Sequence, residues 1–328
     1  MRLMAGGINR ACPSRRREGC WYGSDLPAPA PSLCVLGVPR YAHVVYCGNH
    51  RLRGCMPAFI CTTCGAQYSN TQQPPDGCLI CTDSRQNVNP AGQSWTTMDA
   101  LRKTHFNAFR RLEPGLIGIG TFPAFAIGQR ALLLRTSAGN VLWDCISFLD
   151  DATITLVTAL GGLAAIACSH PHFIASAVAW SHAFKSVPVF VHGRDRKYVP
   201  RQDAVIRYWV EDQVPLADGV TLIRCGGHFP GSAVLHWAAG ASGAGALLTG
   251  DTLLVRPDKK ATFMHSYPNL IPLDPGSVRR IADRLDPWPF EAIYGGWWER
   301  VIPSNAKRAL AESVAQYLNA IGGMLAED

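Results

Sequence analysis

Short apolar runs, each interrupted after a few positions by glycine or a polar residue, mark the middle of the chain. Runs of this length, bounded by turn-forming residues, are typical of β-strands. We therefore expect strands at Ile117–Ile119, Ala124–Ile127, Ala131–Arg135, Val141–Asp144, Leu163–Cys168, Val220–Arg224, Ala233–Ala238, Gly245–Leu248 and Ala292–Tyr294.

Helical patterns lie before, between and after these runs. They predict helices over Met98–Arg111, Ala152–Leu160, Pro275–Leu285 and Asn305–Met324. Strands with interspersed helices in two similar halves predict two packed sheets flanked by helices. No apolar run approaches the roughly eighteen residues of a membrane span, so we expect no membrane association.

The first 55 residues are rich in Arg, Pro and Gly and have no helical or strand periodicity. A segment of this composition buries too little apolar surface to fold, so we expect residues 1–55 to be a disordered basic tail. Its Arg-containing, acid-poor start leaves a mitochondrial presequence open, although Pro13 and Gly6-Gly7 would interrupt the amphipathic helix that such a presequence needs.

The formal net charge of +7 comes mainly from this tail. Residues 1–55 hold eight Arg and two acidic residues, which leaves 23 basic and 22 acidic residues for the rest of the chain. A folded region so close to neutrality gives no indication of a basic groove, and we expect no nucleic-acid partner.

Twelve cysteines are present, and the first twenty residues lack the continuous apolar segment of a secretory signal. We therefore expect a reducing compartment, the cytoplasm, where close cysteine pairs serve as metal ligands rather than disulfides. Cys61-Thr-Thr-Cys64 and Cys78-Leu-Ile-Cys81 are separated by thirteen residues. Two such pairs can present four thiolates to Zn²⁺, so residues 56–92 are predicted to form a small module with a structural zinc site. A redox pair or loose thiols are the alternatives.

Three further motifs follow predicted strands and carry chemistry. They are Ser169-His170-Pro171-His172, Gly226-Gly227-His228-Phe229-Pro230-Gly231-Ser232, and Thr249-Gly250-Asp251. Two histidines at i and i+2 in an extended turn can point both imidazoles at one ion, and a third from a glycine-flanked loop completes a three-nitrogen set. Asp251 can then bind the ion or orient and deprotonate a water molecule. Zinc in such a set makes hydroxide available near neutral pH.

In this order, the three motifs resemble those of the metallo-β-lactamase superfamily, and Leu142-Trp143-Asp144 looks like the apolar–Asp feature of that family's second strand. The resemblance covers about residues 115–300 and implies an αββα sandwich over residues 93–328, preceded by a module similar to zinc ribbons or rubredoxin. It also implies that His170, His172, His228 and Asp251 bind metal.

The chain departs from the family pattern at the second metal position. Where the resemblance implies Asp-His after the first two histidines, the chain has Ile174-Ala175, and where it implies a last histidine, the chain has Gly295-Gly296-Trp297-Trp298. We expect one ion in the sandwich. Residues that could rebuild a second position are His182, Asp258, His265 and Glu299, while Cys168 and Cys225 could offer sulfur and His105, His192 and His236 are expected to be structural.

Two functions are consistent with this reduced ligand set. The first is a single-zinc hydrolase that acts on a small ester, thioester or lactam-like substrate, with Asp251 in the catalytic role. The second is a catalytically degenerate sandwich that serves as a binding or scaffold module. The sequence indicates neither the substrate nor the oligomeric state. A substrate pocket could be lined by Tyr267, Phe229, Trp297 and Trp298.

The predicted tail should contribute little to the thermal stability of the protein. Deleting residues 1–50 removes most of the net positive charge and no predicted core strand. We expect the melting temperature of the truncated protein to match that of the full chain, measured by circular dichroism at equal ionic strength. A large drop would show that the tail packs against the fold.

Overall fold

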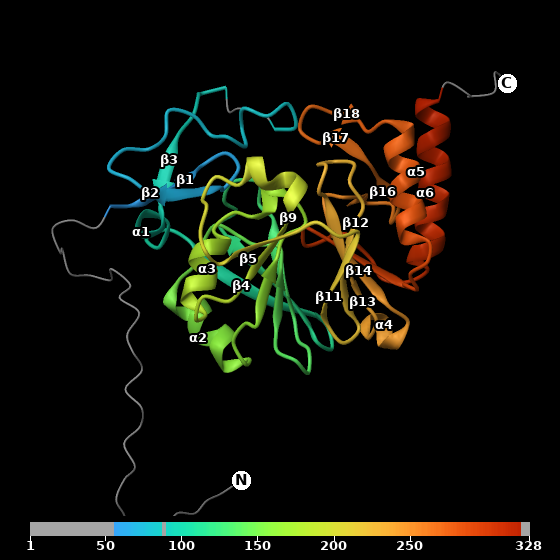
Figure 1. Ribbon diagram of the computed structural model, residues 1–328, viewed down its shortest axis with the longest axis horizontal. Helices are drawn as coiled ribbons and strands as arrows, with labels where there is room; N and C mark the ends of the chain where they lie inside the picture. The colour runs from blue at the N-terminus through green and yellow to red at the C-terminus, as the bar shows by residue number, and fades with distance from the viewer. Residues whose placement is uncertain (1–55, 87–89, 323–328) are drawn as a thin grey trace, which may run out of the picture. The chain divides into compact units, whose positions relative to one another are not determined.

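The computed structural model describes residues 56–86 and 90–322, and all of them belong to one compact unit. The predicted tail lies outside the described residues. Within them, the main architecture is a pair of facing sheets with helices on the outer sides (Figure 1). This is the αββα sandwich that the motifs implied.

The first sheet comes from the earlier half of the chain. Among the described residues it has seven strands, in the spatial order β10 (Ile206–Trp209), β9 (Val189–His192), β8 (Ala165–Ala167), β7 (Val141–Trp143), β6 (Arg130–Leu134), β5 (Leu116–Phe122) and β4 (Phe106–Glu113). Strands β7 to β10 run parallel and β4 to β7 antiparallel. On its outer side lie α2 (Asp151–Ala159) and α3 (Ala177–Ala183) (Figure 1).

The second sheet comes from the later half. Its six strands, counted in the described part of the chain, are ordered β11 (Gln213–Ala217), β12 (Val220–Arg224), β13 (Ala233–Trp237), β14 (Ala246–Gly250), β19 (Ala292–Gly295) and β20 (Val301–Ile302). Outside it pack α5 (Pro275–Leu285) and α6 (Ala306–Ile321), and α4 (Gly240–Gly243) joins β13 to β14. Two small hairpins, β15 (Leu254–Val255) with β16 (Ala261–Thr262) and β17 (Met264–Ser266) with β18 (Ile271–Pro272), follow β14.

Alternation along the strands creates the layers. In β6, Leu132 and Leu134 face the space between the sheets, whereas Leu133 faces α2 and α3. Because successive side chains of a strand point to opposite faces, one apolar strand supplies two cores. The inner core contains residues of both sheets, including Trp143 and Leu235, and the outer cores hold the helices.

A small third sheet precedes the sandwich. Its order is β2 (Gln67–Asn70), β1 (Ala58–Cys61) and β3 (Trp95–Thr97), and we call residues 56–86 and 90–97 the four-cysteine module. The sheet thus reaches Thr97, beyond the residue 92 expected from the cysteine spacing. Backbone and side-chain hydrogen bonds attach the module to the sandwich, among them Gln67 N to Ala175 O (3.1 Å) and Ser147 Oγ to Gly65 O (2.8 Å).

The helix expected over Met98–Arg111 is largely wrong. Only α1 (Met98–Leu101) is helical, and β4 follows it. Pro114 and Gly115, with Gly115 at a φ of +88°, form a two-residue turn that pairs β4 with β5. Proline followed by a glycine at positive φ suits a tight turn, and the resulting ladder overrides the helical spacing.

The strand expected over Ala124–Ile127 is also wrong. This segment is a loop between β5 and β6, closed by a hydrogen bond from Gly128 N to Phe125 O (2.9 Å). Elsewhere the expected elements are present within a few residues, and β12 and α5 have the expected bounds. Asp274 caps α5 by accepting from Ser277 N, and Pro275 occupies the first turn, where no hydrogen-bond donor is missed.

A buried carboxylate joins the two sheets near one edge. Asp195 lies in η2 (Gly193–Tyr198), directly after β9, and its Oδ1 accepts a hydrogen bond from Gly231 N at 2.7 Å. Gly231 belongs to the loop between β12 and β13. Burial raises the pKa of Asp195 to about 7, although the amide of Gly231 and the charge of Arg85 act in the opposite direction.

This raised pKa gives a stability prediction with a defined sign. In the unfolded chain the pKa of Asp is about 3.9. Between about pH 4 and pH 7 the folded state therefore binds more protons than the unfolded state, so the free energy of unfolding falls as pH rises. Asn at position 195 retains an acceptor for Gly231 but cannot ionise. We expect the melting temperature of wild type, relative to Asp195→Asn, to drop between pH 4.5 and pH 7.5. A difference that stays constant with pH would contradict the assignment.

Candidate metal centres

Three histidines and an aspartate meet at one edge of the sandwich. His170 and His172 follow β8, with His172 in the short 3-10 helix η1 (Pro171–Phe173), while His228 lies between β12 and β13 and Asp251 directly follows β14. One ligand atom of each lies within 4.8 Å of the others. The structure therefore brings together the four residues expected from the sequence, two from each sheet. We call them the histidine site.

One polar atom of each residue in this site has no hydrogen-bond partner. The side chains are buried, and His170 Nε2, His172 Nε2, His228 Nε2 and Asp251 Oδ1 make no hydrogen bond. Buried polar atoms are nearly always satisfied, and four unsatisfied ones converging on one point are an exception that needs a cause. Three nitrogens and one carboxylate oxygen are a ligand set that zinc prefers. The residues fit a metal ion.

Hydrogen bonds on the far side of two imidazoles set their direction. His228 Nδ1 donates to Met264 O at 3.1 Å, and His170 Nδ1 lies 2.8 Å from Ser169 Oγ. A partner on Nδ1 leaves Nε2 free to coordinate, which is the usual arrangement around metal-binding histidines. Asp144, the residue of the apolar–Asp feature, accepts from Ser169 N at 2.7 Å and so holds the same turn.

The glycine before Asp251 is required by this packing. Gly250 has a φ of +51°, and a Cβ there would lie 2.2 Å from Ser169 Oγ. Only glycine lets β14 approach the Ser169–His170 turn so closely. The Gly-Asp dipeptide therefore has a structural reason as well as a chemical one.

The site disfavours charge on its own residues. Burial lowers the pKa of His172 to about 3, with a smaller contribution from the charge of Arg85. Burial and neighbouring imidazoles lower the pKa of His170 and of His228 well below the usual range, and burial raises the pKa of Asp251 well above it. Neutral imidazoles offer lone pairs to a cation, and a cation would in turn stabilise the ionised Asp251.

The residues at the positions where the resemblance implied further ligands are packed against apolar groups. Ile174 and Ala175 are buried in the core between the first sheet and its helices. At the other end of the site, the ring of Phe173 lies against Gly296, where a Cβ would be 2.6 Å from it, and also packs on His170 at 4.6 Å between ring centres. The space is filled by packing rather than by ligands.

The residues considered as replacement ligands lie elsewhere. His182 pairs with Asp203 (3.0 Å), His265 lies beside Ser84 Oγ (3.2 Å), and Glu299 pairs with Arg110 (3.1 Å). Within the part of the chain that the structure describes, none of them, nor Asp258, Cys168 or Cys225, joins a group able to hold a metal ion. His105, His192 and His236 also stand outside such groups, in contact with Phe125, Trp209 and Pro289 respectively.

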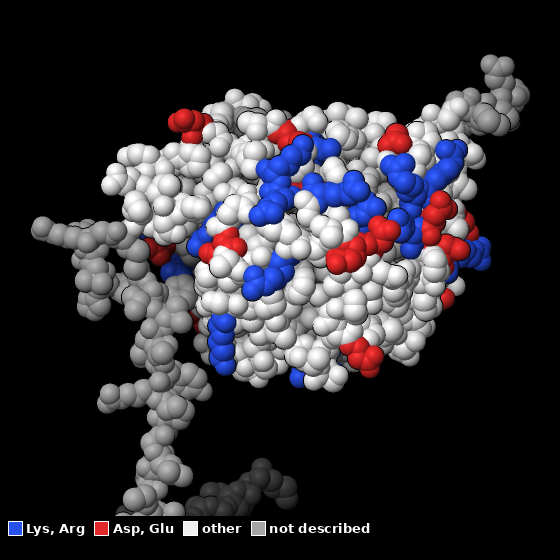
Figure 2. Space-filling model, in the orientation of Figure 1, with Lys and Arg blue, Asp and Glu red and all other residues white. Residues whose placement is uncertain are grey.

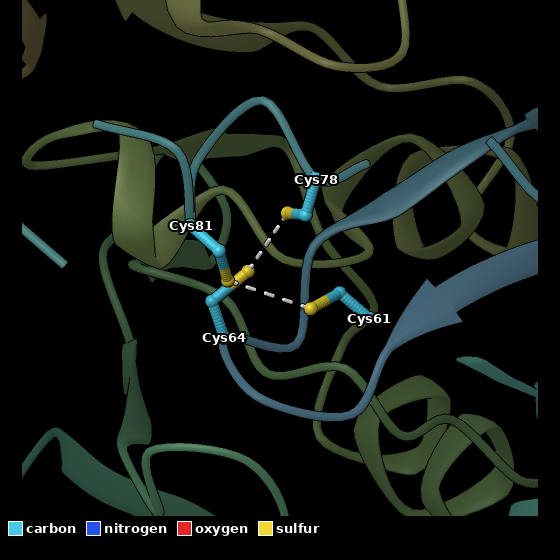
Figure 3. A group of neighbouring side chains, drawn as sticks. All are labelled: Cys61, Cys64, Cys78 and Cys81. Carbon is cyan, nitrogen blue, oxygen red and sulfur yellow. Dashed lines mark hydrogen bonds between the residues drawn. The ribbon is translucent and has the colours of Figure 1, made fainter. Parts of the chain in front are cut away.

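The four cysteines of the module form a second candidate centre. Cys61, Cys64, Cys78 and Cys81 are buried, and Figure 3 shows their sulfurs pointing toward one another. Cys61 Sγ lies 3.6 Å from Cys81 Sγ, and Cys64 Sγ lies 3.5 Å from Cys78 Sγ. Sulfurs around a tetrahedral zinc ion lie about 3.8 Å apart, whereas a disulfide bond is about 2.05 Å long. The spacing suits a metal ion.

Neighbouring thiols shift the pKa values of these cysteines in opposite directions. The thiols of Cys64, Cys78 and Cys81 lower the pKa of Cys61, and the same proximity raises the pKa of Cys64. Tyr68 Oη donates to Cys78 Sγ (3.4 Å) and Gln93 Nε2 to Cys61 Sγ (3.2 Å). One thiolate forms readily, but several in such close contact require a cation.

A cavity of about 820 Å³ is lined by two aromatic residues that pack near the histidine site, but by none of the four residues of that site. Its wall includes Tyr267, whose ring lies 5.4 Å from that of His228, and Trp297, which contacts Phe173. Of the four aromatic residues expected around a pocket, Tyr267, Trp297 and Trp298 line it. Phe229 does not, because it is fully buried beside His172 and Tyr198. The remaining lining residues are Leu254, Pro257, Lys259, Pro268, Glu299 and Arg300.

Arg85 and Asp195 reach the loop of His228 and were not singled out from the sequence. Arg85 Nε donates to the carbonyl of His228 at 2.6 Å, across 143 positions of the chain, and Asp195 contacts Gly231. No local motif marks either residue, because each contact joins segments that only the fold brings together.

The chain is similar to known proteins in its fold and, for one relative, in its sequence. No family model matches the chain. Solved structures with a similar fold include VMB-1 (TM-score 0.49, 13% identity, covering 66% of this chain and 98% of that one), the DIM-1 metallo-β-lactamase (0.49, 13%, 65% and 98%) and the metallo-β-lactamase FIM-1 from Pseudomonas aeruginosa in its mono-zinc form (0.47, 13%, 66% and 96%). At such identities the likeness concerns the fold alone.

Among curated proteins, the uncharacterized protein YmaE of Bacillus subtilis (strain 168) is 42% identical over 273 residues. The match covers 82% of this chain and 99% of YmaE. The chain therefore belongs to the same family as YmaE.

Proposed function

We propose that this protein is a metal-dependent hydrolase of the metallo-β-lactamase type with one zinc ion in the histidine site. The observation that carries the proposal is the convergence of His170, His172, His228 and Asp251 with four buried, unpartnered ligand atoms. Zinc in such a set supplies Lewis acidity and makes hydroxide available near neutral pH.

The residues in and around the histidine site would have distinct roles in binding the ion and in proton transfer. The three neutral imidazoles would hold the ion. Hydrogen bonds to Ser169 and to Met264 O would keep the rings of His170 and His228 oriented toward it. Asp251 Oδ2 lies 3.7 Å from His170 Nε2, and its Oδ1 has no partner. Asp251 could therefore complete the ligand set or accept a proton from an attacking water.

The cavity suggests a small substrate, and we propose an ester, a thioester or a lactam-like amide. Aromatic walls from Tyr267, Trp297 and Trp298 suit an apolar portion of such a molecule. Glu299 is paired with Arg110, whereas Lys259 and Arg300 have no carboxylate within ion-pair distance among the described residues. Those two cations would favour a substrate that carries an acidic group.

We propose no nucleic-acid partner. Figure 2 shows Lys and Arg side chains gathered across one face but interspersed with Asp and Glu. Ion pairs of this kind include Arg224 and Arg284, which both contact Asp212. Such pairing weakens the field available to a polyanion. In the described part of the chain, no helix has the length and apolar content needed to cross a membrane.

We propose a reducing, cytoplasmic location, which the seven free cysteines of the described residues support. We also propose that zinc occupies the four-cysteine site. A site closed by four sulfurs does no chemistry, and the binding energy of its ion stabilises a small module that has little core of its own.

A catalytically degenerate scaffold is the second candidate. Catalytic zinc sites keep one position open, whereas three histidines and an aspartate are enough to close a tetrahedral set. All four side chains are nearly inaccessible to solvent. If Asp251 coordinates the ion permanently, the site would be structural and the sandwich would serve binding.

Metal analysis combined with activity separates the two candidates. We expect wild type to hold two zinc ions per chain and His228→Ala to retain one, with any hydrolysis of nitrophenyl ester, thioester or lactam probes lost in the variant. The control is His236→Ala, which removes a buried histidine outside the site. Two zinc ions in wild type, one of them lost in His228→Ala, without turnover of any probe by wild type would support the scaffold. A wild-type total of one, removed by Cys61→Ser, would exclude the metal-dependent hydrolase.

The four-cysteine site is tested separately. Cys61→Ser or Cys78→Ser should lower the zinc content by one ion per chain and raise hydrogen exchange in the module, because loss of one thiolate removes most of the binding energy. Cys145→Ser, a buried cysteine outside both sites, is the matched control. Full zinc content in both variants would refute the assignment.

A further inference from the structure

The segment that leaves the four-cysteine site runs directly onto the histidine site. Cys81 is followed within four residues by Arg85, whose side chain is only 14% exposed. Its guanidinium Nε donates to the carbonyl oxygen of His228 at 2.6 Å. A residue of the module thus holds the backbone of a residue in the histidine site.

Partners from both sides fix the guanidinium. Its Nη1 lies 2.7 and 3.0 Å from the two carboxylate oxygens of Asp83, within the module. On the sandwich side, it stacks over the ring of Phe229 at 4.5 Å, and Ser266 Oγ donates to the carbonyl of Arg85 at 3.0 Å. Charge-assisted bonds and stacking of this kind leave the group little freedom.

His228 is consequently held at two points. Arg85 fixes its carbonyl, and Met264 O fixes its Nδ1, which together determine where Nε2 points. Two glycines, Gly226 and Gly227, precede it with positive φ values, so the backbone on this side of His228 is intrinsically permissive and contacts such as that of Arg85 restrict it. Hydrogen bonds that orient metal ligands typically change metal affinity by about 10- to 100-fold when they are removed.

We propose that Arg85 is a positioning residue through which the folded four-cysteine module sets the metal affinity of the histidine site. The module is then part of the working site rather than an independent appendage. This inference deepens the proposed function and rests on it in one respect, namely that the histidine site binds an ion.

The first arm of the test compares affinities at the histidine site. The full-length wild type, Arg85→Ala and Arg85→Lys are loaded with Co²⁺, whose thiolate and imidazole complexes absorb differently, and titrated with a chelator. We expect Arg85→Ala to keep its thiolate-bound ion and to bind the second ion at least tenfold more weakly. Arg85→Lys should fall between, because Lys keeps the charge and a donor but not the planar fork.

A matched control is available in Arg256→Ala. Arg256 pairs with Asp258 at 2.6 Å, also two positions away in the chain, and contacts no residue of the histidine site. This variant should leave both affinities unchanged. An affinity of Arg85→Ala within twofold of wild type would overturn the proposal.

The second arm asks whether the module acts through Arg85. Cys81→Ser should weaken the histidine site by a factor similar to Arg85→Ala, and the double variant should be no weaker than Cys81→Ser alone. If the two effects multiply instead, the module and Arg85 act independently and the proposed link is wrong.

The third arm needs no ion in the histidine site. In protein that keeps its thiolate-bound ion but has the histidine site emptied by chelation, amide hydrogen exchange of residues 226–232 should be faster in Arg85→Ala than in Arg256→Ala. If wild type binds no ion at the histidine site, the proposed hydrolase fails, and this exchange measurement still decides the role of Arg85. Equal exchange in the two variants would overturn that role.

Discussion

Desolvation of four ligand atoms is the constraint around which this protein is organised. Three imidazole nitrogens and a carboxylate oxygen are buried without hydrogen-bond partners, two residues coming from each sheet. Leaving them unsatisfied costs several kcal/mol in total, at about 1–3 kcal/mol for each group. A cation at their centre would recover that cost and tie the two halves of the sandwich together. The Ser169 turn, Gly250 and the loop of His228 all serve to bring those atoms to one point.

Apolar packing surrounds the positions where the resemblance implied ligands for a second metal ion. Ile174 and Ala175 are part of the apolar core, and the carbonyl of Ala175 accepts a hydrogen bond from Gln67 of the four-cysteine module. Gly296 makes room for Phe173, which packs against His170. The side chains of these apolar residues have no atom that could bind a second ion, which favours a one-ion site.

The four-cysteine module and the sandwich are consequently hard to consider apart. Gly65 accepts from Ser147, Gln67 donates to Ala175, and Arg85 donates to His228. Three parts of the module thus contact the sandwich, and the last of them contacts the histidine site. A metal ion bound by the four sulfurs would hold those parts in fixed relation. A small module with few core residues would not otherwise order a buried arginine against a distant loop.

The residues alone indicated the ligand groups and the layered sandwich, because ligands come in short motifs and strand alternation is local. The two Cys-x-x-Cys pairs and the His-x-His turn place their ligand atoms close together through local backbone geometry, whatever fold surrounds them. The features that depend on long-range strand pairing and on burial were determined only by the tertiary structure. The segment after Met98 has helical spacing, yet the Pro114-Gly115 turn pairs it with β5 as a strand. Phe229, expected at a pocket wall, is buried beside His172, and Arg85 reaches His228 across 143 positions. Such contacts depend on which surfaces the folded sheets bring together, and no local spacing encodes that.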